Sequence, residues 1–426
     1  MDLQQRDKKH IWHPLTQHKT HPDVLPIVKA KGALLFDESG NEFIDGIASW
    51  YTCMYGHCND YIIEKVHSQM LQLDQIVFSG FTHSPAIKLS EKLISILPNN
   101  QQKIFFSDNG STATEIGMKM ALQFHYNQGN DRDTILAFEE GFHGDTFGAM
   151  SASGLSVYNG PFTKHFIKVV RIPVPTKSTI DDVLVKLDQL IFKHKIAGFI
   201  YEPLVQGAAG MIMYNPEELN AILEVCQQNN IITIADEVMT GFGKTGTNFA
   251  SEQVATKPDV ICMSKALTAG MMPMAITSCT QNIYDAFYSN DIGKGLFHAH
   301  TYTANPLACS AASAGIDLLL SKEIQTKITN IHNAHLNFIA QIKNHKLVKN
   351  TRVQGVILAF ELNIKMERYG SLRDKLFEHF KKEKVFLRPL GSTVYILPPY
   401  VITPEQLQQI YNSVLSLLGN LETGKF

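Results

Sequence analysis

The sequence predicts an α/β fold in which a large domain holds a mostly parallel sheet sandwiched by helices, followed by a smaller α/β domain. Two observations indicate this fold. Between residues 103 and 263, short apolar runs of strand length alternate with segments of helix length. After about residue 310 the alternation gives way to longer helical stretches. A chain of 426 residues is long enough for two or three domains.

The N-terminal segment predicts an arm followed by a small hairpin. Residues 1–30 are rich in His, Lys and Pro, so we expect an arm rather than a packed element. Residues 36–38 and 42–44 are short strand-like runs, and the polar link between them contains Gly40. This pattern is typical of a hairpin. We expect residues 1–48 to join the small domain.

The middle of the chain predicts the large domain, residues 49–310. Residues 103–107 form an apolar run, and residues 111–126 carry apolar side chains at helical spacing. Further buried strands are expected at 134–138, 196–201, 231–235 and 260–263. Segments of helix length separate these strands, which favours parallel pairing.

The small domain is predicted over residues 311–426. A long helix is expected at 311–344 and a second at 372–384, with a last helix from residue 404. Strand-like segments at 353–362 and 386–397 lie between these helices.

The composition favours a cytoplasmic enzyme with small-molecule substrates. Lys and Arg together number 38 and Asp and Glu 40, for a net charge of −2, so we expect no general attraction to nucleic acid or an anionic membrane. No apolar run approaches the roughly 20 residues of a membrane span, and the polar N-terminus lacks the apolar core of a signal peptide. The six cysteines lack paired spacing and are expected to be reduced.

Residues 241–246 match the dinucleotide motif G-x-G-x-x-G, but their context argues against it. Too few residues separate Gly246 from the next strand for a crossover helix of ordinary length. The same segment ends like a P-loop, yet Val238 stands where a P-loop requires its first glycine. Nicotinamide and nucleotide-triphosphate enzymes therefore stay as remote alternatives. The histidines show no metal-ligand spacing, so no metal is expected.

Three polar residues follow apolar strands at their C-terminal ends: Glu202, Asp236 and Lys265. In a parallel sheet these ends share the edge where ligands bind. Each has a plainer interpretation, a surface lysine or a helix cap. Together they favour pyridoxal phosphate chemistry, in which a lysine amine condenses with the cofactor aldehyde and a carboxylate keeps the pyridine nitrogen protonated. Residues 108–112 open a helix whose N–H groups suit the phosphate.

These residues lie in motifs that resemble those of the class III aminotransferases. The motifs are DEVMTGFGKTG at 236–246, SKAL at 264–267, NGS at 109–111, GFHG at 141–144, EP at 202–203 and TYTANP at 301–306. The resemblance covers nearly the whole chain. It implies a fold type I pyridoxal-phosphate enzyme that works as a homodimer with its active site at the subunit interface.

The resemblance also assigns the cofactor site. It implies that Lys265 is the catalytic residue that bonds to pyridoxal 5′-phosphate and that Asp236 holds the pyridine nitrogen. Gly110 and Ser111 would bind the phosphate, which Thr301 would reach from the partner subunit. The ring of Phe142 would stack on the cofactor.

Within the class, further motifs resemble the biotin-pathway subfamily that converts 8-amino-7-oxononanoate to 7,8-diaminononanoate with S-adenosylmethionine as amino donor. They are HIWHP at 10–14, SW at 49–50, FHGDTFGAM at 142–150, EPLVQG at 202–207 and RPLG at 388–391. The resemblance implies that Trp50 lines the substrate channel, that Arg388 binds a substrate carboxylate, and that Tyr395 is a further substrate contact.

The chain departs from the subfamily pattern in three places. Leu15 and Phe142 stand where many members carry Tyr, and Ala299 precedes His300 and Thr301 where the subfamily has Gly-Pro-Thr. We expect Leu15, Phe142, Ala299 and Lys265 to belong to the substrate site as well. The departures leave the donor open, with lysine as an alternative. They also leave open another class III transaminase acting on a diamine, an ω-amino acid or 4-aminobutyrate.

Overall fold

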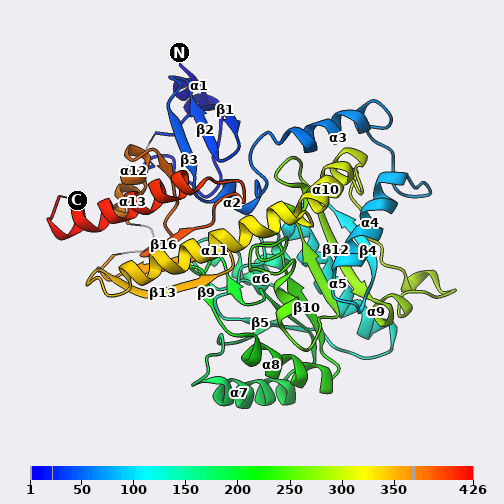
Figure 1. Cartoon of the computed structure of the whole chain (residues 1–426). Coiled ribbons are helices and arrows are strands. Elements are labelled where there is room, and N and C mark those ends of the chain that lie inside the picture. Colours follow the sequence, from blue (N-terminus) through cyan, green and yellow to red (C-terminus); the bar gives the residue numbers. More distant parts are fainter. Residues whose placement is uncertain (1, 22, 367–369, 426) are drawn as a thin grey trace. The chain divides into compact units, whose positions relative to one another are not determined.

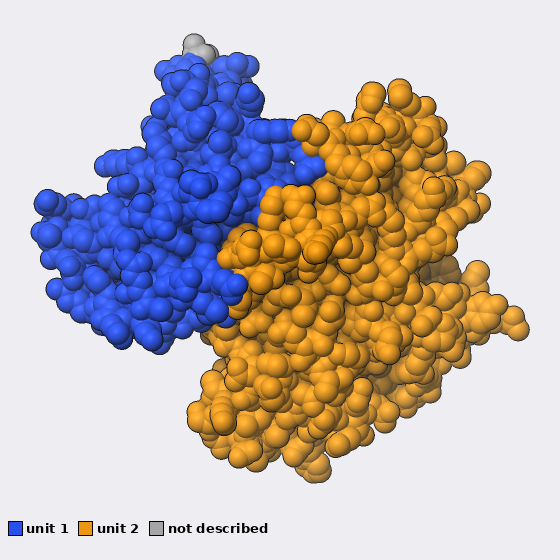
Figure 2. All heavy atoms as spheres, in the orientation of Figure 1, with its two compact units in different colours: residues 1–59, 333–353, 357–426 blue, residues 60–332, 354–356 orange. Residues whose placement is uncertain are grey.

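The computed structural model describes residues 2–21, 23–366 and 370–425 (Figure 1). Its contacts divide the chain into two compact units (Figure 2): residues 1–59, 333–353 and 357–426 form unit 1, and residues 60–332 and 354–356 form unit 2. The predicted domain boundaries, after residues 48 and 310, stay a prediction.

Unit 2 contains a seven-stranded sheet of order β4-β12-β11-β10-β7-β5-β6. Its strands are β4 (Gln101–Ser107), β5 (Thr134–Phe138), β6 (Val169–Ile172), β7 (Ile196–Tyr201), β10 (Ile232–Asp236), β11 (Val260–Met263) and β12 (Ala275–Thr280). Strand β12 runs antiparallel to both its neighbours, whereas β11, β10, β7, β5 and β6 pair in parallel. The prediction of an α/β fold with a mostly parallel sheet is confirmed.

Helices and one small hairpin complete unit 2. They are α3 (Asp60–Met70), α4 (Ser84–Ile96), α5 (Gly110–Asn127), α6 (Phe147–Ala152), α7 (Ile180–Lys193), α8 (Pro216–Gln228), α9 (Gln281–Asp285), α10 (Pro306–Leu319), β8 (Val205–Gln206) and β9 (Ile212–Met213). The apolar face of α5 packs on the sheet through residues such as Ile116 and Met120, which share a buried core cluster with Ile234 and Val260. All residues of β10 are buried, as expected for a strand that is covered on both faces.

Helix α11 (Lys322–Ile342) follows α10 and contains the boundary between the units. The sequence predicts one helix over 311–344, but the structure ends α10 at Leu319 and begins a new helix at Lys322. The Ser321 hydroxyl accepts a hydrogen bond from the Ile324 amide at 3.3 Å, as a helix cap does.

Unit 1 contains two small sheets, of order β1-β2-β3-β15 and β13-β14-β16. The strands are β1 (Ile27–Lys31), β2 (Leu34–Asp37), β3 (Glu42–Asp45), β13 (Val348–Gln354), β14 (Ile357–Leu362), β15 (Val385–Phe386) and β16 (Thr393–Ile396), and the helices are α1 (Leu3–His10), α2 (Ala48–Tyr51), α12 (Ser371–Lys382) and α13 (Pro404–Glu422). Strands β2 and β3 pair antiparallel, so the predicted hairpin is present.

The N-terminal arm is more ordered than the sequence predicts. It contains helix α1, capped by the Asp2 side chain, and strand β1, which pairs with β2. No residue of α1 is buried, so its capping and charge pattern rather than apolar packing define it. In the described residues, none of the helices combines the length and apolarity that crossing a membrane requires.

Candidate active site

Lys265 and Asp236 lie at the ends of adjacent parallel strands in unit 2. Asp236 is the last residue of β10 and pairs in register with Cys262 of β11, three positions before Lys265. Lys265 begins a short 3-10 turn and has a left-handed backbone, with φ of 49°. Such a conformation is unfavourable for a residue with a Cβ and is concentrated at functional sites.

The buried Asp236 carboxylate is held on both oxygens. Oδ2 lies 2.8 Å from Nδ1 of His143, and Oδ1 accepts a hydrogen bond from the Val238 amide at 3.1 Å. His143 is also buried. This arrangement fixes the carboxylate at the end of the strand, where it can face a ligand.

Glu202 follows β7 and is buried, and its carboxylate interacts electrostatically with His143 and Asp236. Its Oε2 accepts from the Phe142 amide at 3.0 Å and its Oε1 from the Gly207 amide at 2.9 Å. Burial raises the pKa of Glu202 to about 7, a shift that His143 opposes and Asp236 reinforces. Glu202 therefore orients the backbone that carries the half-exposed Phe142 ring.

The electrostatics of Lys265 suit an amine that must be reactive at neutral pH. Burial lowers the pKa of Lys265, an effect that the charges of Asp236 and Glu202 oppose. A lowered pKa increases the fraction of neutral amine, which is the nucleophilic form.

The N-terminus of α5 provides an anion site near Asp236. Asn109 caps the helix, accepting from the Thr112 amide at 3.0 Å, while the first-turn N–H groups at Gly110 and Ser111 have no carbonyl before them in the helix. A Cβ on Gly110 would lie 2.8 Å from a methyl group of Val238, so glycine lets this helix end approach the loop after Asp236.

Ser111 also contacts the segment that carries Phe142 and His143. Its hydroxyl accepts a hydrogen bond from the Asp145 amide at 3.1 Å. Gly144 has φ of 127°, and a Cβ there would lie only 2.2 Å from the Ser111 oxygen. The structure therefore brings Ser111, Phe142, Asp236 and Lys265 into one region of unit 2, with an amine, a carboxylate and an anion cradle. These groups fit pyridoxal phosphate.

Thr301 and Ala299 lie in the exposed segment before α10. The Thr301 carbonyl accepts from the Gln75 side chain at 3.0 Å, a contact within the same unit. Their predicted roles at the cofactor and substrate stay predictions.

The substrate residues predicted at Trp50, Arg388 and Tyr395 form a second cluster, within unit 1. The Arg388 guanidinium lies over the Trp50 ring, 5.0 Å from its centroid. The Tyr51 hydroxyl donates to that of Tyr395 at 3.0 Å, and Tyr395 is buried.

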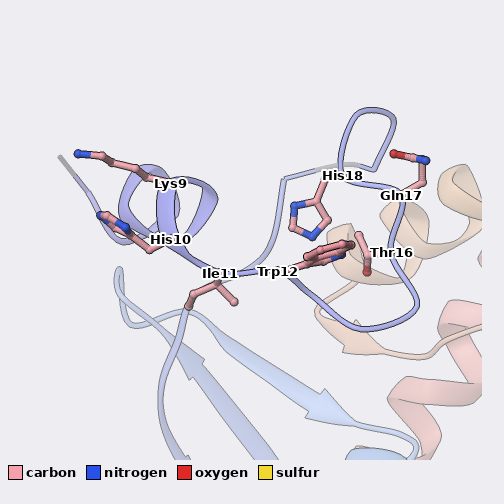
Figure 3. Close-up of a pocket in the computed structure, with 7 residues that line it drawn as sticks. All are labelled: Lys9, His10, Ile11, Trp12, Thr16, Gln17 and His18. Carbon is pink, nitrogen blue, oxygen red and sulfur yellow. The ribbon is translucent and has the colours of Figure 1, made fainter. Parts of the chain in front are cut away.

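Leu15 lies in the N-terminal arm, with a left-handed φ of 51° and a half-exposed side chain. The nearby hollow in Figure 3 is lined only by arm residues: Lys9, His10, Ile11, Trp12, Thr16, Gln17 and His18. Leu15 is not among them. The hollow therefore gives no support to a substrate role for Leu15.

The sequence-based site omitted His143 and Lys244. Lys244 belongs to the glycine-rich segment and is fully buried, and within the described residues its amine has no hydrogen-bond partner. Burial lowers the pKa of Lys244 to about 7, reinforced by the charge of Lys265 and opposed by Glu237. The GFHG motif names His143, but only the fold shows that it meets Asp236.

The family model described as aminotransferase class III matches residues 15–418. The chain belongs to the class III aminotransferases. This explains the glycine-rich segment at 241–246: in this aminotransferase it follows Asp236 and leads into a short 3-10 turn, Ala250–Gln253, rather than into a nucleotide-binding helix.

Relatives of this aminotransferase cover nearly its whole length. An adenosylmethionine-8-amino-7-oxononanoate aminotransferase from Synechococcus elongatus is 40% identical over 97% of this chain and 99% of its own. One from Helicobacter pylori is 34% identical over 98% of each chain. The crystal structure of the enzyme of that name from Methanocaldococcus jannaschii is 30% identical, with a TM-score of 0.91 over 97% of this chain and 98% of its own. A thermostable (S)-enantioselective omega-transaminase from Thermomicrobium roseum is 25% identical, with a TM-score of 0.92 over 98% of each.

Proposed function

We propose that this aminotransferase converts 8-amino-7-oxononanoate to 7,8-diaminononanoate in biotin biosynthesis, with pyridoxal 5′-phosphate as its cofactor. The observation that carries the proposal is the pair Asp236 and Lys265 at the ends of adjacent strands β10 and β11. Full-length relatives named for 8-amino-7-oxononanoate support the choice of acceptor.

The residues that would hold the cofactor are those gathered at the sheet edge. Lys265 would bond to it, Asp236 would pair with its ring nitrogen, Gly110 and Ser111 would donate to its phosphate, and Phe142 would lie against its ring. When bound, pyridoxal phosphate supplies an electron sink that lets the substrate carbon lose a proton. His143 holds Asp236 in place for this pairing through the 2.8 Å contact.

Lys265 is also the group that we assign to proton transfer. With the cofactor bound, the Nζ amine would take the proton from the substrate carbon and deliver it to the cofactor carbon, and would move it in the opposite direction in the acceptor half-reaction. A general base works best when its pKa lies near the working pH, and burial lowers the pKa of Lys265 in that direction.

The acceptor has an apolar chain that ends in a carboxylate. We assign the carboxylate to Arg388, whose guanidinium can bind it through two parallel hydrogen bonds. The Trp50 ring that stacks on Arg388 offers apolar surface, and burying each methylene of the chain is worth roughly 0.8 kcal/mol. Tyr395, held by Tyr51, supports this cluster.

The amino donor is a separate part of the proposal. We propose S-adenosylmethionine, the donor in the names of the relatives. Leu15 and Phe142 lack the phenolic hydroxyls of the subfamily pattern, so we expect a weaker hold on this donor. We further propose that the enzyme is a cytoplasmic homodimer in which Thr301 completes the partner's phosphate site.

An acceptor screen with the purified holoenzyme tests the proposal. S-adenosylmethionine and lysine are each offered as donors with 8-amino-7-oxononanoate or with succinic semialdehyde, and products are identified by mass spectrometry. We expect 7,8-diaminononanoate with at least one donor. Amination of succinic semialdehyde alone would instead assign a 4-aminobutyrate-type transaminase.

A further inference from the structure

The short element α2, Ala48–Tyr51, is an unusual left-handed turn. Ala48, Ser49, Trp50 and Tyr51 all have positive φ, of 46°, 45°, 66° and 70°. Residues with a Cβ visit this region singly rather than in runs, because the Cβ crowds the following carbonyl oxygen. Four in succession persist only where the surroundings hold them in place.

A buried carboxylate and a histidine hold this turn. Asp45 is fully buried, and its Oδ1 accepts from the Ile47 amide at 3.2 Å. Its Oδ2 accepts from the Ser49 hydroxyl at 2.8 Å and lies 2.9 Å from Nε2 of His57. The His57 backbone is itself fixed, because its amide and carbonyl both bond to Gly32.

The histidine supplies the positive charge that a buried carboxylate requires. Burial disfavours that charge, but hydrogen bonds and charge interactions with Asp45 and Cys53 together outweigh burial and raise the pKa of His57 to about 10. Asp45 and His57 are thus an ion pair at neutral pH, which we call the clamp.

The clamp is continuous with the strand that leads to Arg388. Asp45 pairs in register with Phe386 of β15, and the Gly46 amide donates to the Phe386 carbonyl at 3.0 Å. The turn places Trp50 against the Arg388 guanidinium. Within the described residues, no carboxylate forms an ion pair with Arg388, so its charge is available to an anion.

We propose that Asp45 and His57 are positioning residues, which hold the left-handed turn and thereby keep the Trp50–Arg388 pair in the geometry that binds a substrate carboxylate. The inference deepens the proposed function and rests on it for the identity of the acceptor. It requires that loss of the clamp weaken the binding of a substrate with a carboxylate more than the binding of a substrate that lacks it.

Two assays test the clamp, and the first does not depend on turnover. The chain has 2 tryptophans, so a Trp12→Phe background leaves Trp50 as the single tryptophan reporter, which is excited selectively at the red edge of its absorption. Heptanoate, an apolar chain with one carboxylate, is titrated into the holoenzyme while Trp50 emission is followed. The clamp variants are Asp45→Asn and His57→Gln, which conserve size. Arg388→Ala shows how much heptanoate affinity is lost when the guanidinium is removed.

His335→Gln is the matched control, since His335 is a fully buried histidine of the same unit that contacts the Tyr411 hydroxyl at 2.7 Å. We expect both clamp variants to weaken heptanoate binding by about tenfold or more, and the control by less than about twofold. Unchanged affinity in the clamp variants would overturn the inference, as would a parent enzyme that does not bind heptanoate. Thermal melts identify any variant that fails to fold. If one clamp variant does not fold, the affinity of the other clamp variant tests the inference.

The second assay compares kcat/KM for 8-amino-7-oxononanoate with that for 2-aminononan-3-one, in which a methyl group replaces the carboxylate. The clamp variants should lose their preference for the acid, whereas a purely structural defect would lower both values alike and overturn the positioning role. An enzyme that binds heptanoate through the clamp but aminates neither ketone would contradict the proposed function while leaving the clamp supported.

Discussion

Replacing Asp236 by Asn removes one charge from the proposed cofactor site and replaces the oxygen that lies 2.8 Å from Nδ1 of His143 by an NH2 group. The Asn side chain has the same size and can still accept the hydrogen bond from the Val238 amide that Asp236 accepts at 3.1 Å. An ion pair at about 4 Å is worth about 4 kcal/mol at an effective dielectric of ~20. If the transition state used all of this energy, turnover would fall by about three orders of magnitude.

The realised loss should be smaller than this bound, because the same charge also stabilises the protonated ring in the ground state. We expect Asp236→Asn to retain cofactor, seen in its absorbance, and to lose at least about tenfold in kcat, roughly 1.4 kcal/mol. Steady-state assays measure kcat, and single-turnover mixing with the donor measures the rate of the donor half-reaction.

A matched control is Asp259→Asn. Asp259 precedes β11 at the opposite end of the strand from Lys265 and accepts from the Thr233 amide and hydroxyl at 2.9 and 2.8 Å. This variant should lose stability without a comparable loss of kcat. If Asp236→Asn kept turnover within about threefold of wild type, the charge would have no catalytic role and Asp236 would be a structural cap.

Three further predictions follow from the site. Borohydride reduction of the holoenzyme and peptide mapping should place the phosphopyridoxyl group on Lys265, and label on a different lysine would contradict the assignment. Lys265→Ala should abolish turnover while leaving the far-ultraviolet circular dichroism spectrum unchanged. Leu15→Tyr and Phe142→Tyr should each lower the KM for S-adenosylmethionine more than that for the acceptor, since a new hydrogen bond contributes roughly 0.5–1.5 kcal/mol; an equal change in both would refute a donor-specific effect. Because the pKa of Glu202 rises from 4.5 to about 7 on folding, its contribution to stability is largest below pH 4.5 and declines as pH rises toward 7. Denaturant titrations of the cofactor-free protein should show this decline in wild type and a flatter profile in Glu202→Gln, and identical profiles would argue against the shift.

Much of the large domain could be predicted from apolar runs, because its central strands are buried on both faces. The run at 231–235 corresponds to β10 within one residue, and that at 260–263 corresponds to β11. Polar residues just past such runs stand out in a sequence. This is why Asp236 and Lys265 could be proposed as neighbours before the fold was known.

Strand β12 escaped prediction because its buried residues include hydroxyl side chains. Thr277 and Ser278 are fully buried, and their hydroxyls donate to the Ala113 carbonyl at 2.9 Å and to the Gln101 side chain at 2.7 Å. Both partners are distant in the sequence, so no local pattern reveals that these polar groups are satisfied.

The contact between His143 and Asp236, and the turn held by Asp45 and His57, are invisible for a related reason. Each depends on a side chain from another element, and a run of left-handed residues has no local sequence signal when it contains no glycine. A motif can include such a residue, but it does not show which other residues the side chain contacts.

The most direct test of the central claim isolates the acceptor half-reaction from the choice of donor. The enzyme is loaded with pyridoxamine phosphate, mixed with 8-amino-7-oxononanoate alone, and followed by cofactor absorbance and mass spectrometry. The proposed function predicts that the aldehyde form of the cofactor returns and that 7,8-diaminononanoate appears in equal amount. No change in absorbance with this ketone, together with a rapid change with succinic semialdehyde, would contradict it.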